Sequence, residues 1–417
     1  MSQTRKEAGA VKIEKLILNT PSGTLNLTPV TTRLDLYESI LSPYIVCELL
    51  ISDSIGVADK FPRITEMTVD IQFTTDENFA PISHRLAVFD IAMKSYSAGD
   101  KVQMYKVTCV SEDFDKPEAR ESIQYPYNNT CAFLVADLLQ NKIKSTKEAY
   151  FEQTDGILPP SSLSNKTPYQ LIDYFRTIAL SPTYQSHSFV FYQDKYGYKF
   201  TTIEKLIEEG KKKIGDRVFQ YNEVAPSKID HTVSNWRSIL ARDVVVENSA
   251  KWEEYLGGNN PRATEFNLEH GSVVQIENLE FNFVRMDDGG TAPKTNARTD
   301  KTKDRATENL FFVRANEDDP VPTKKMLALR MFLPELLSIV SHIEIYGDST
   351  MTVGEMLKVE IPEIDGLTER KTEQSQTHSG NYLILRMRHM IDMAGPPFYT
   401  QALEICKSGS ARGFCGT

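Results

Sequence analysis

Two stretches near opposite ends of the chain repeat one pattern of predicted strands in the same order. Each has an acidic turn, then an apolar strand, then a hairpin that ends in Cys-x-Ser. These parts lie at residues 51–54, 66–71 and 89–111 in the first stretch, and at residues 345–349, 355–361 and 382–408 in the second. The ordered set predicts two related β domains within one chain, with other material inserted between them. Such a duplication lets an oligomer of odd symmetry imitate a ring with twice as many subunits.

Residues 35–56, DLYESILSPYIVCELLISDSIG, contain the clearest single strand. Ile45, Cys47, Leu49 and Ile51 alternate with a mixed set of side chains, so one side of this strand is wholly apolar. A long antiparallel strand has this pattern when one side covers a core and the other meets solvent or a neighbouring subunit. We therefore expect the first β domain to be organised around this strand.

Residues 11–115 have the alternation and the turn residues of an all-β barrel or sandwich. Composition then changes, because Asn129 or Thr130 can cap a predicted helix whose apolar residues recur at helical spacing. A second predicted helix has Thr167 as its cap and Pro168 as its first residue.

Two strands, at residues 188–193 and 198–201, and a short helix ending at Gly210 follow these helices. Together they complete a mixed α+β domain. Strand-like segments resume at residues 218–224 and 238–246.

The chain before the second repeat is less regular. Residues 286–309 contain almost no apolar side chain, so we expect a mobile loop or an edge that becomes ordered only in an assembly. A helix is predicted from about residue 324 to residue 340, and Pro334 either kinks it or begins a second helical segment.

The predicted fold class is therefore mainly β with α+β. It comprises two related antiparallel β-barrel domains, an inserted α+β domain and an inserted loop-rich segment. The first β domain is placed at residues 1–115, the α+β domain at 116–215, the second β domain at 216–248 and 328–417, and the partly mobile insertion at 249–327.

The charge of the chain excludes one class of function. Asp and Glu number 57 and Lys and Arg number 47, which gives a net charge of −10 over 417 residues. Phosphate binding needs a basic surface, so the chain is not built to grip nucleic acid, although it can line a passage that DNA crosses without sticking. The five cysteines show no ligand-like spacing, and we expect buried or incidental thiols in a chain made in reducing cytoplasm. No apolar run predicts a signal peptide or a membrane span.

No constellation in the sequence predicts catalytic, cofactor-binding or metal-binding residues. The block GDS at residues 347–349 is similar to the nucleophile block of one hydrolase family, but turn residues are expected at this strand end. The seven histidines never occur at metal-ligand spacing, and surface or satisfied core positions are expected for them. The acidic segments 287–290 and 317–319 are interpreted as solvated turns, and residues 208–213 lack the glycine spacing of a phosphate loop.

The sequence leaves two further possibilities open. A glycosidase pair of carboxylates is a spatial signal that a sequence does not reveal. Trp236, Trp252 and several tyrosines could line a sugar groove, although two tryptophans are a thin supply for one. The interpretation favoured by the sequence is a protein that is not an enzyme and needs no cofactor and no small-molecule substrate.

Four groups of residues resemble the baseplate hub family of contractile-tailed phages, and they occur in the family's order over most of the chain. The groups are Leu36-Tyr37-Glu38-Ser39-Ile40 with Ser42-Pro43-Tyr44 and Ser52-Asp53; Pro168-Tyr169-Gln170-Leu171-Ile172-Asp173 with residues 189–200; Val353-Gly354-Glu355 with Val359-Glu360-Ile361-Pro362; and Ser379-Gly380-Asn381-Tyr382-Leu383-Ile384 with His389 and Tyr399. None of these groups is a catalytic fingerprint, so the resemblance depends on their ordered combination.

The resemblance implies a structural subunit of the virion tail baseplate, assembled in the host cytoplasm. It implies a homotrimer whose two β domains alternate in a pseudo-sixfold ring, joining the sixfold tail tube or tube-initiator protein to a threefold central spike. Baseplate wedge proteins are further implied partners, and DNA would cross the lumen without specific binding. The α+β domain and the insertion at 249–327 would then brace the trimer or hold the spike.

Two other classes remain. A hub or spike adaptor of a phage-derived contractile injection or secretion system would share the fold. A tail-associated cell-wall hydrolase would be an enzyme and would cleave purified peptidoglycan.

Overall fold

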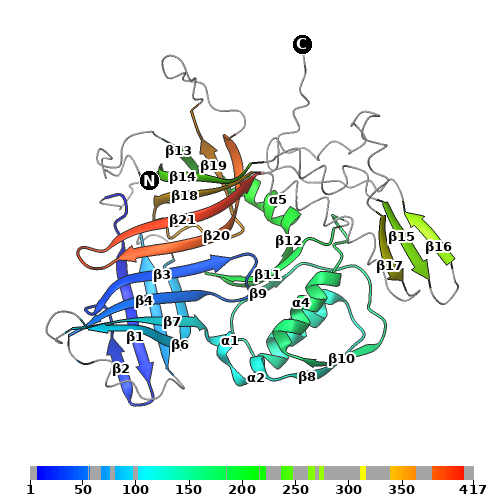
Figure 1. Ribbon diagram of the computed structural model, residues 1–417, viewed down its shortest axis with the longest axis horizontal. Helices are drawn as coiled ribbons and strands as arrows, with labels where there is room; N and C mark the ends of the chain where they lie inside the picture. Colours follow the sequence, from blue (N-terminus) through cyan, green and yellow to red (C-terminus); the bar gives the residue numbers. More distant parts are fainter. Residues whose placement is uncertain are drawn as a thin grey trace, which may run out of the picture.

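The chain folds around one continuous sheet of thirteen strands, into which a smaller α+β domain is inserted (Figure 1). The computed structural model describes residues 7–54, 56, 67–75, 80–96, 102–184, 186–215, 217–221, 236–247, 262–267, 272–276, 310–315, 339–362 and 378–407.

Five strands near each end of the chain are connected in the same way. In the first repeat, the neighbours in the sheet are β3 (Thr31–Ser39), β4 (Val46–Asp53), β7 (Gln103–Ser111), β6 (Ile82–Tyr96) and β5 (Thr68–Thr74). In the second repeat, they are β14 (Ser238–Glu247), β18 (Ile339–Tyr346), β21 (Phe398–Lys407), β20 (Gly380–Asp392) and β19 (Met356–Glu360). Both sets place their first, second, fifth, fourth and third strands side by side, all antiparallel. The predicted fold class, with two related antiparallel β-barrel domains, is confirmed.

Further strands extend each repeat within the sheet. In the first repeat β1 (Lys12–Thr20) pairs with β5 and with β2 (Gly23–Asn26). In the second, β13 (Val218–Tyr221) is parallel to both β14 and β19, and β19 also pairs with β20, so the strands close into a barrel. Each repeat encloses its own core, formed around Leu49 and Phe73 in the first and around Ile343 and Leu383 in the second. Burial of these side chains, at roughly 25 cal/mol for each Å² removed from water, is the main source of stability.

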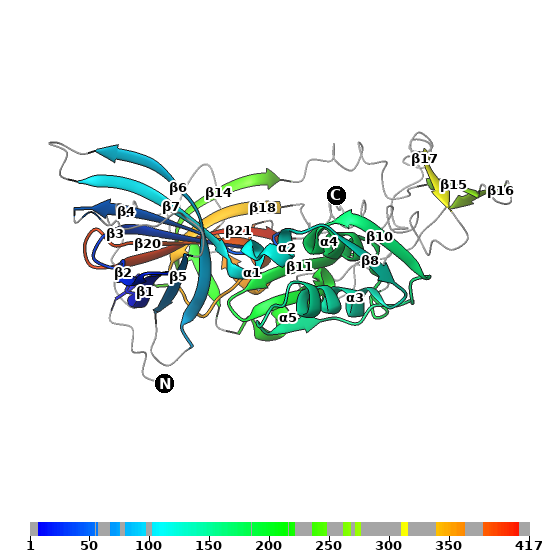
Figure 2. The same cartoon turned by 90° about the horizontal axis from the view of Figure 1, so that it is seen from below.

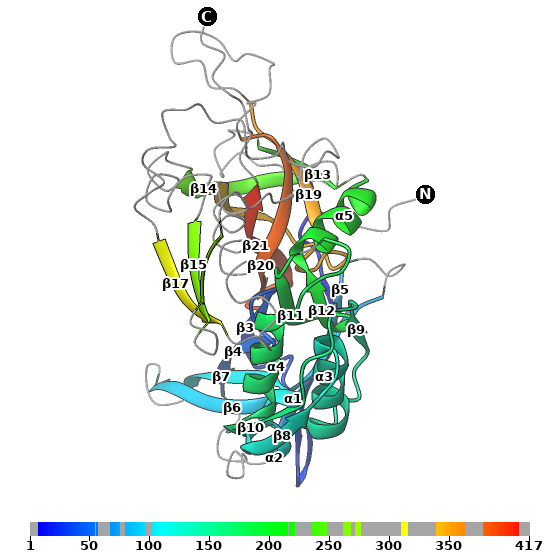
Figure 3. The same ribbon diagram turned by 90° about the vertical axis from the view of Figure 1, so that its right-hand side faces the viewer.

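The two repeats are joined by main-chain pairing. Strand β20 is antiparallel to β3, from Arg386 opposite Ser39 to Asp392 opposite Arg33. Eight strands therefore follow one another without a break, in the order β6, β7, β4, β3, β20, β21, β18 and β14. Figure 3 shows this run as a curved sheet with β14 near one end and β6 near the other.

Both long hairpins carry a β-bulge at the matching place. In β6, Phe89 has no partner, because Val88 and Asp90 pair with consecutive residues of β7. In β20, Leu385 is the extra residue in the same way, opposite β21. A bulge adds local twist and fixes the register on either side of it. The shared bulge gives a residue-level correspondence between the repeats, in which Asp90 matches Arg386.

The α+β domain lies beside the large sheet (Figure 2), packs its helices against two small sheets and has its own core. Its elements are α1 (Glu112–Asp115), α2 (Pro117–Arg120), β8 (Ile123–Tyr127), α3 (Cys131–Asp137), a π-helix at Leu138–Lys142, β9 (Ala149–Phe151), β10 (Ser161–Lys166), α4 (Pro168–Ile178), β11 (Phe189–Asp194), β12 (Gly197–Thr202) and α5 (Ile203–Lys213). The predicted caps are confirmed. The Thr130 hydroxyl accepts from the amide of Phe133, and Thr167 and Gln170 form a reciprocal capping box at α4.

Two helix predictions were wrong at their ends. The helix expected to stop at Gly210 continues to Lys213 as α5. The glycine is needed for packing instead, because a Cβ at Gly210 would lie 2.5 Å from Cγ of Met356 on β19. The helix expected up to residue 340 cannot extend that far, since β18 begins at Ile339; the rest of that prediction lies outside the described residues.

The insertion at 249–327 is described only in part. Its described residues form a separate three-stranded sheet of β15 (Arg262–Asn267), β16 (Ser272–Ile276) and β17 (Leu310–Ala315). The polar stretch 286–309, predicted to be a mobile loop or an edge, lies outside the described residues. The domain boundaries stay a prediction.

Replacing Gly347 by alanine is expected to destabilise the fold by about 1–3 kcal/mol through overpacking. A Cβ there would lie 2.0 Å from Cδ1 of Tyr399, whose ring is fully buried. Gly395→Ala is the matched control, because a Cβ at Gly395 meets nothing within 4 Å and should change stability by less than about 0.5 kcal/mol. Urea unfolding of both variants measures the difference, and equal midpoints would contradict this packing.

Candidate functional site at the junction of the two repeats

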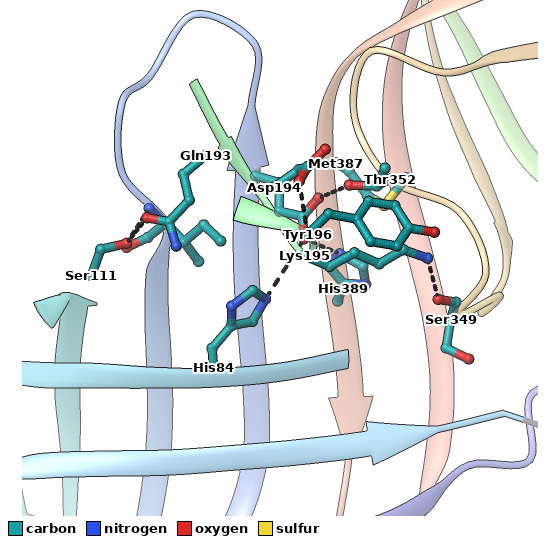
Figure 4. Close-up of polar contacts among 12 residues, drawn as sticks. His84, Ser111, Gln193, Asp194, Lys195, Tyr196, Ser349, Thr352, Met387 and His389 are labelled. Atoms are coloured by element: carbon teal, nitrogen blue, oxygen red, sulfur yellow. Dashed lines mark hydrogen bonds and ion pairs between the residues drawn. The ribbon is translucent and has the colours of Figure 1, made fainter. Parts of the chain in front are cut away.

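A buried ionisable cluster lies where the two repeats meet (Figure 4). Glu38 comes from β3, His84 from β6 and His389 from β20, and all three side chains are buried. Oε1 of Glu38 lies 3.9 Å from Nε2 of His84 and 3.7 Å from Nε2 of His389. Its other oxygen accepts a hydrogen bond of 2.8 Å from the hydroxyl of Thr352, in the loop between β18 and β19. One carboxylate therefore faces groups from both repeats.

The surroundings decide the charges in this cluster. Burial by itself raises the pKa of Glu38, but the close approach and charge of His389, the charge of His84 and the hydrogen bond from Thr352 outweigh it and lower the pKa to about 2. Burial lowers the pKa of His84 to about 4, although the charge of Glu38 opposes this shift. At neutral pH the cluster thus holds an ionised carboxylate and a neutral His84.

The ring of His389 is held by its neighbours. Its Nδ1 lies 2.6 Å from the hydroxyl of Tyr399, and the Gln401 amide donates to that same hydroxyl at 2.8 Å. The ring of Phe73, at the end of β5, meets the rings of His389 and Tyr399 edge-on, with centroids 6.0 and 5.6 Å away. A side chain of the first repeat therefore packs on the polar network of the second.

The GDS block at 347–349 connects the repeats. The amide of Asp348 donates to Oε1 of Gln401 at 3.0 Å. The hydroxyl of Ser349 lies 2.9 Å from that of Thr75, just after β5, and accepts from the Thr75 amide at 3.1 Å. This serine thus forms hydrogen bonds with the main chain and the side chain of the other repeat, so its role here is to hold the two repeats together.

The β11–β12 hairpin of the α+β domain inserts at the same junction (Figure 4). The hydroxyl of Ser111, at the end of β7, donates to Oε1 of Gln193 at 2.7 Å, and Nζ of Lys195 donates to the carbonyl of Ser349 at 2.8 Å. Burial lowers the pKa of Lys195, an effect opposed by Glu355 and Glu38. A Cβ at Gly354 would lie 2.5 Å from the Tyr192 hydroxyl. One hairpin thus contacts both repeats, and three parts of the chain share this junction.

The eight-stranded run has its buried cluster on one face and ion pairs on the other, concave face (Figure 3). Arg388 of β20 lies 3.2 Å from Asp35 of β3, and its guanidinium is 5.2 Å from the ring centroid of Tyr37. Arg386 pairs with Glu404 at 3.1 Å. A hollow of about 490 Å³ lies over these strands.

Carboxylates exceed cations on this face. By strand alternation, the charged side chains that the structure describes on it are Asp35, Glu48, Asp90, Asp243, Glu344, Asp392 and Glu404, against Arg33, Arg85, Lys106, Arg386 and Arg388. Seven carboxylates and five cations leave an excess of two negative charges.

The other residues considered from the sequence do not gather into a site. His187 is buried with Nδ1 2.7 Å from the carbonyl of Ala179, and His342 is exposed on the concave face. Within the described ranges, no group of three His, Cys, Asp or Glu residues is arranged to hold a metal ion. No helix in that part of the chain is long and apolar enough to cross a membrane. Trp252 and the acidic segments 287–290 and 317–319 lie outside the described residues.

Sequence reasoning missed the cluster of Glu38, His84 and His389. One signal for it was present, because Glu38 falls between Leu36 and Ile40 on the apolar side of β3. A carboxylate at such a position needs a buried partner. The identity of the partners depends on strand pairing across some 350 residues, which one sequence does not reveal.

The repeated sheet, the shared junction and the inserted α+β domain form a fold that is similar to the folds of phage tail proteins of known structure. A tail protein from Neisseria meningitidis MC58 is 8% identical with a TM-score of 0.51, covering 95% of this chain and 97% of its own. The 43 kDa tail protein of prophage MuSo2 from Shewanella oneidensis is 11% identical with a TM-score of 0.50, covering 94% and 98%. No family model matches the sequence, and no curated protein does. The predicted resemblance to the baseplate hub family is thus confirmed at the level of the fold.

Acidification should weaken the fold through His84. Its folded pKa of about 4 is below the unfolded value of 6.5, so its contribution is complete above pH 6.5 and is lost as the pH falls towards 4, by at most about 3 kcal/mol. Glu38 contributes its own loss only below its unfolded value of 4.5. Urea unfolding from about pH 7 to about pH 4.5 should therefore show a slope that His84→Gln reduces.

The matched control for this series is His342→Gln, whose side chain is 53% exposed. It should keep the slope of the unsubstituted chain. If His84→Gln also kept that slope, the histidine would be shown to titrate normally, and the depressed pKa would be wrong.

Proposed function

We propose that this chain is a structural hub subunit of a phage tail baseplate, and that three copies form a ring with pseudo-sixfold symmetry. The ring would adapt a sixfold tail tube to a threefold central spike. The observation that carries this proposal is the duplicated sheet, in which two repeats with one strand order are fused side by side through β3 and β20. Three copies would present six similar faces to the tube and three identical ones to the spike.

The curvature and charge of the eight-stranded run support a passage for DNA. Its concave face would line the lumen, and this face has an excess of carboxylates among the described side chains. Its arginines and its lysine face nearby carboxylates, as Lys106 does Glu48 at 2.8 Å. A surface with its cations neutralised and a net negative charge has little attraction for phosphates, so DNA would slide rather than bind.

The remaining parts would brace this ring. The α+β domain at 116–215 touches both repeats through the β11–β12 hairpin, so it would fix the angle between them. The insertion at 249–327 would contact the spike or a second copy. Tail tube or tube-initiator protein, spike and wedge proteins are the proposed partners, and the proposed role is structural rather than enzymatic. The protein would be located in the virion tail after assembly in the host cytoplasm.

The mass of the purified chain, measured by light scattering alone and with its spike partner, tests this proposal. Three copies are expected in at least the second condition, because a threefold spike supplies matching symmetry. A chain that stays monomeric with the spike present would overturn the proposal. Cleavage of purified peptidoglycan would then favour a tail-associated hydrolase, whereas a trimer encoded beside sheath genes without capsid genes would favour an injection-system adaptor.

A further inference from the structure

The eight-stranded run has two open edges, and they belong to strands of different repeats. Strand β5 pairs with β6 only as far as Ala87, so the edge of β6 from Asp90 to Tyr96 has no strand beside it in the described part of the chain. Strand β13 covers β14 only at Ser238 and Ile239, which leaves the rest of β14 open among the same residues. Such edges present unpaired N–H and C=O groups to a partner strand.

The pairing of β20 with β3 within the chain indicates which strand each open edge can pair with. By the shared strand order, β20 corresponds to β6 and β3 corresponds to β14. Within the chain β20 pairs with β3. The same contact between two copies would therefore place β6 of one copy beside β14 of the next, antiparallel.

The ladders carry this correspondence to single residues. Because the bulges match, Thr108 of β7 corresponds to Glu404 of β21. Following the ladders from these two residues across the next two strands shows that Asp35 of β3 corresponds to Asp243 of β14. Four residues before Thr108 and Glu404, Met104 of β7 corresponds to Thr400 of β21. Met104 pairs with Ser95 and Thr400 pairs with Met390, so Ser95 of β6 corresponds to Met390 of β20. Because Met390 lies opposite Asp35 within the chain, Ser95 should lie opposite Asp243 of the next copy.

A second pair follows from the same correspondence. Ala92 matches Arg388 through their partners Lys106 and Ala402. Tyr37 matches Val246, because their partners Val46 and Val340 occupy the same place in the two repeats. Arg388 lies opposite Tyr37 within the chain, so Ala92 should lie opposite Val246 of the next copy.

The two edge strands also share an irregularity that the internal pair lacks. Between Ala92 and Ser95, β6 has one residue more than the corresponding part of β20, and between Asp243 and Val246, β14 has one more than β3. Each extra residue alone would break a ladder with a regular strand. Together they give equal spans of three residues, so the two edges fit each other.

We propose that copies of this chain join edge to edge through β6 and β14, antiparallel, with Ala92 opposite Val246 and Ser95 opposite Asp243. The occupant of each edge is thus a second copy of the chain. This inference rests on the proposed ring and specifies its contact, since three such contacts close the eight-stranded runs into a ring and cover both of these edges.

Disulfide trapping in the full chain tests the register. All variants carry Cys415→Ser, so that the fifth native cysteine cannot form a disulfide. The other four, Cys47, Cys109, Cys131 and Cys406, are buried. One variant has Ala92→Cys with Val246→Cys, and a second has Ser95→Cys with Asp243→Cys. The control, Ala92→Cys with Val244→Cys, is shifted by two residues. Directly opposed residues are close enough for a disulfide, whereas diagonal neighbours about 7–8 Å apart are poorly placed.

After mild oxidation, non-reducing denaturing gels should show covalent dimers and trimers in both in-register variants, at least about fivefold more than in the shifted control. Light scattering on the same samples tests the register of the contact separately from the proposed hub function. A trimer without preferential cross-linking would overturn the register and leave the hub function standing. A monomer with the spike partner present would overturn both.

Discussion

The pairing of β3 with β20 is the contact on which the rest of this molecule depends. Seven consecutive residue pairs connect the main chains of the two repeats, so two barrels share one sheet rather than touching through side chains. Main-chain hydrogen bonds within a sheet fix spacing and direction together. Because of this ladder, the concave face, the two open edges and the site of the β11–β12 hairpin all have fixed positions relative to one another.

The buried cluster explains why this ladder has only one register. Removing a carboxylate from water is costly unless charged or hydrogen-bonding groups surround it, and Glu38 finds such groups in Thr352 and the two histidines. Side chains alternate along a strand, so a slip of β3 by one residue would turn Glu38 towards the concave face and Tyr37 into the core. The cluster thus favours this one register, and His84 makes the stability of the fold depend on pH.

Much of this architecture could be predicted because it depends on local patterns. The alternation of Ile45 with its neighbours, the cap at Thr167 and the repeated hairpins each need only nearby residues, and they predicted the strands, α4 and the duplication. The junction could not be predicted in the same way. Glu38 shows in the sequence as a carboxylate on an apolar side, but its partners depend on pairing between distant strands. The helix end predicted at Gly210 was wrong for a related reason. The glycine is there because its small size lets the helix pack against Met356, which lies on a distant strand.

The differences between the internal junction and the open edges follow from how each would form. The internal junction forms within one chain, where the two strands are always at high effective concentration, so it tolerates the desolvation of Glu38. A contact between separate copies has no such advantage and must also overcome the entropy of association. At the edge, Arg242 and Val244 stand where β3 has Leu34 and Leu36. In the proposed contact, the matched extra residues would select the register in place of the buried charge. The two repeats thus differ where they pair, since one junction is held within the chain and the other, in the proposed ring, would form only on assembly.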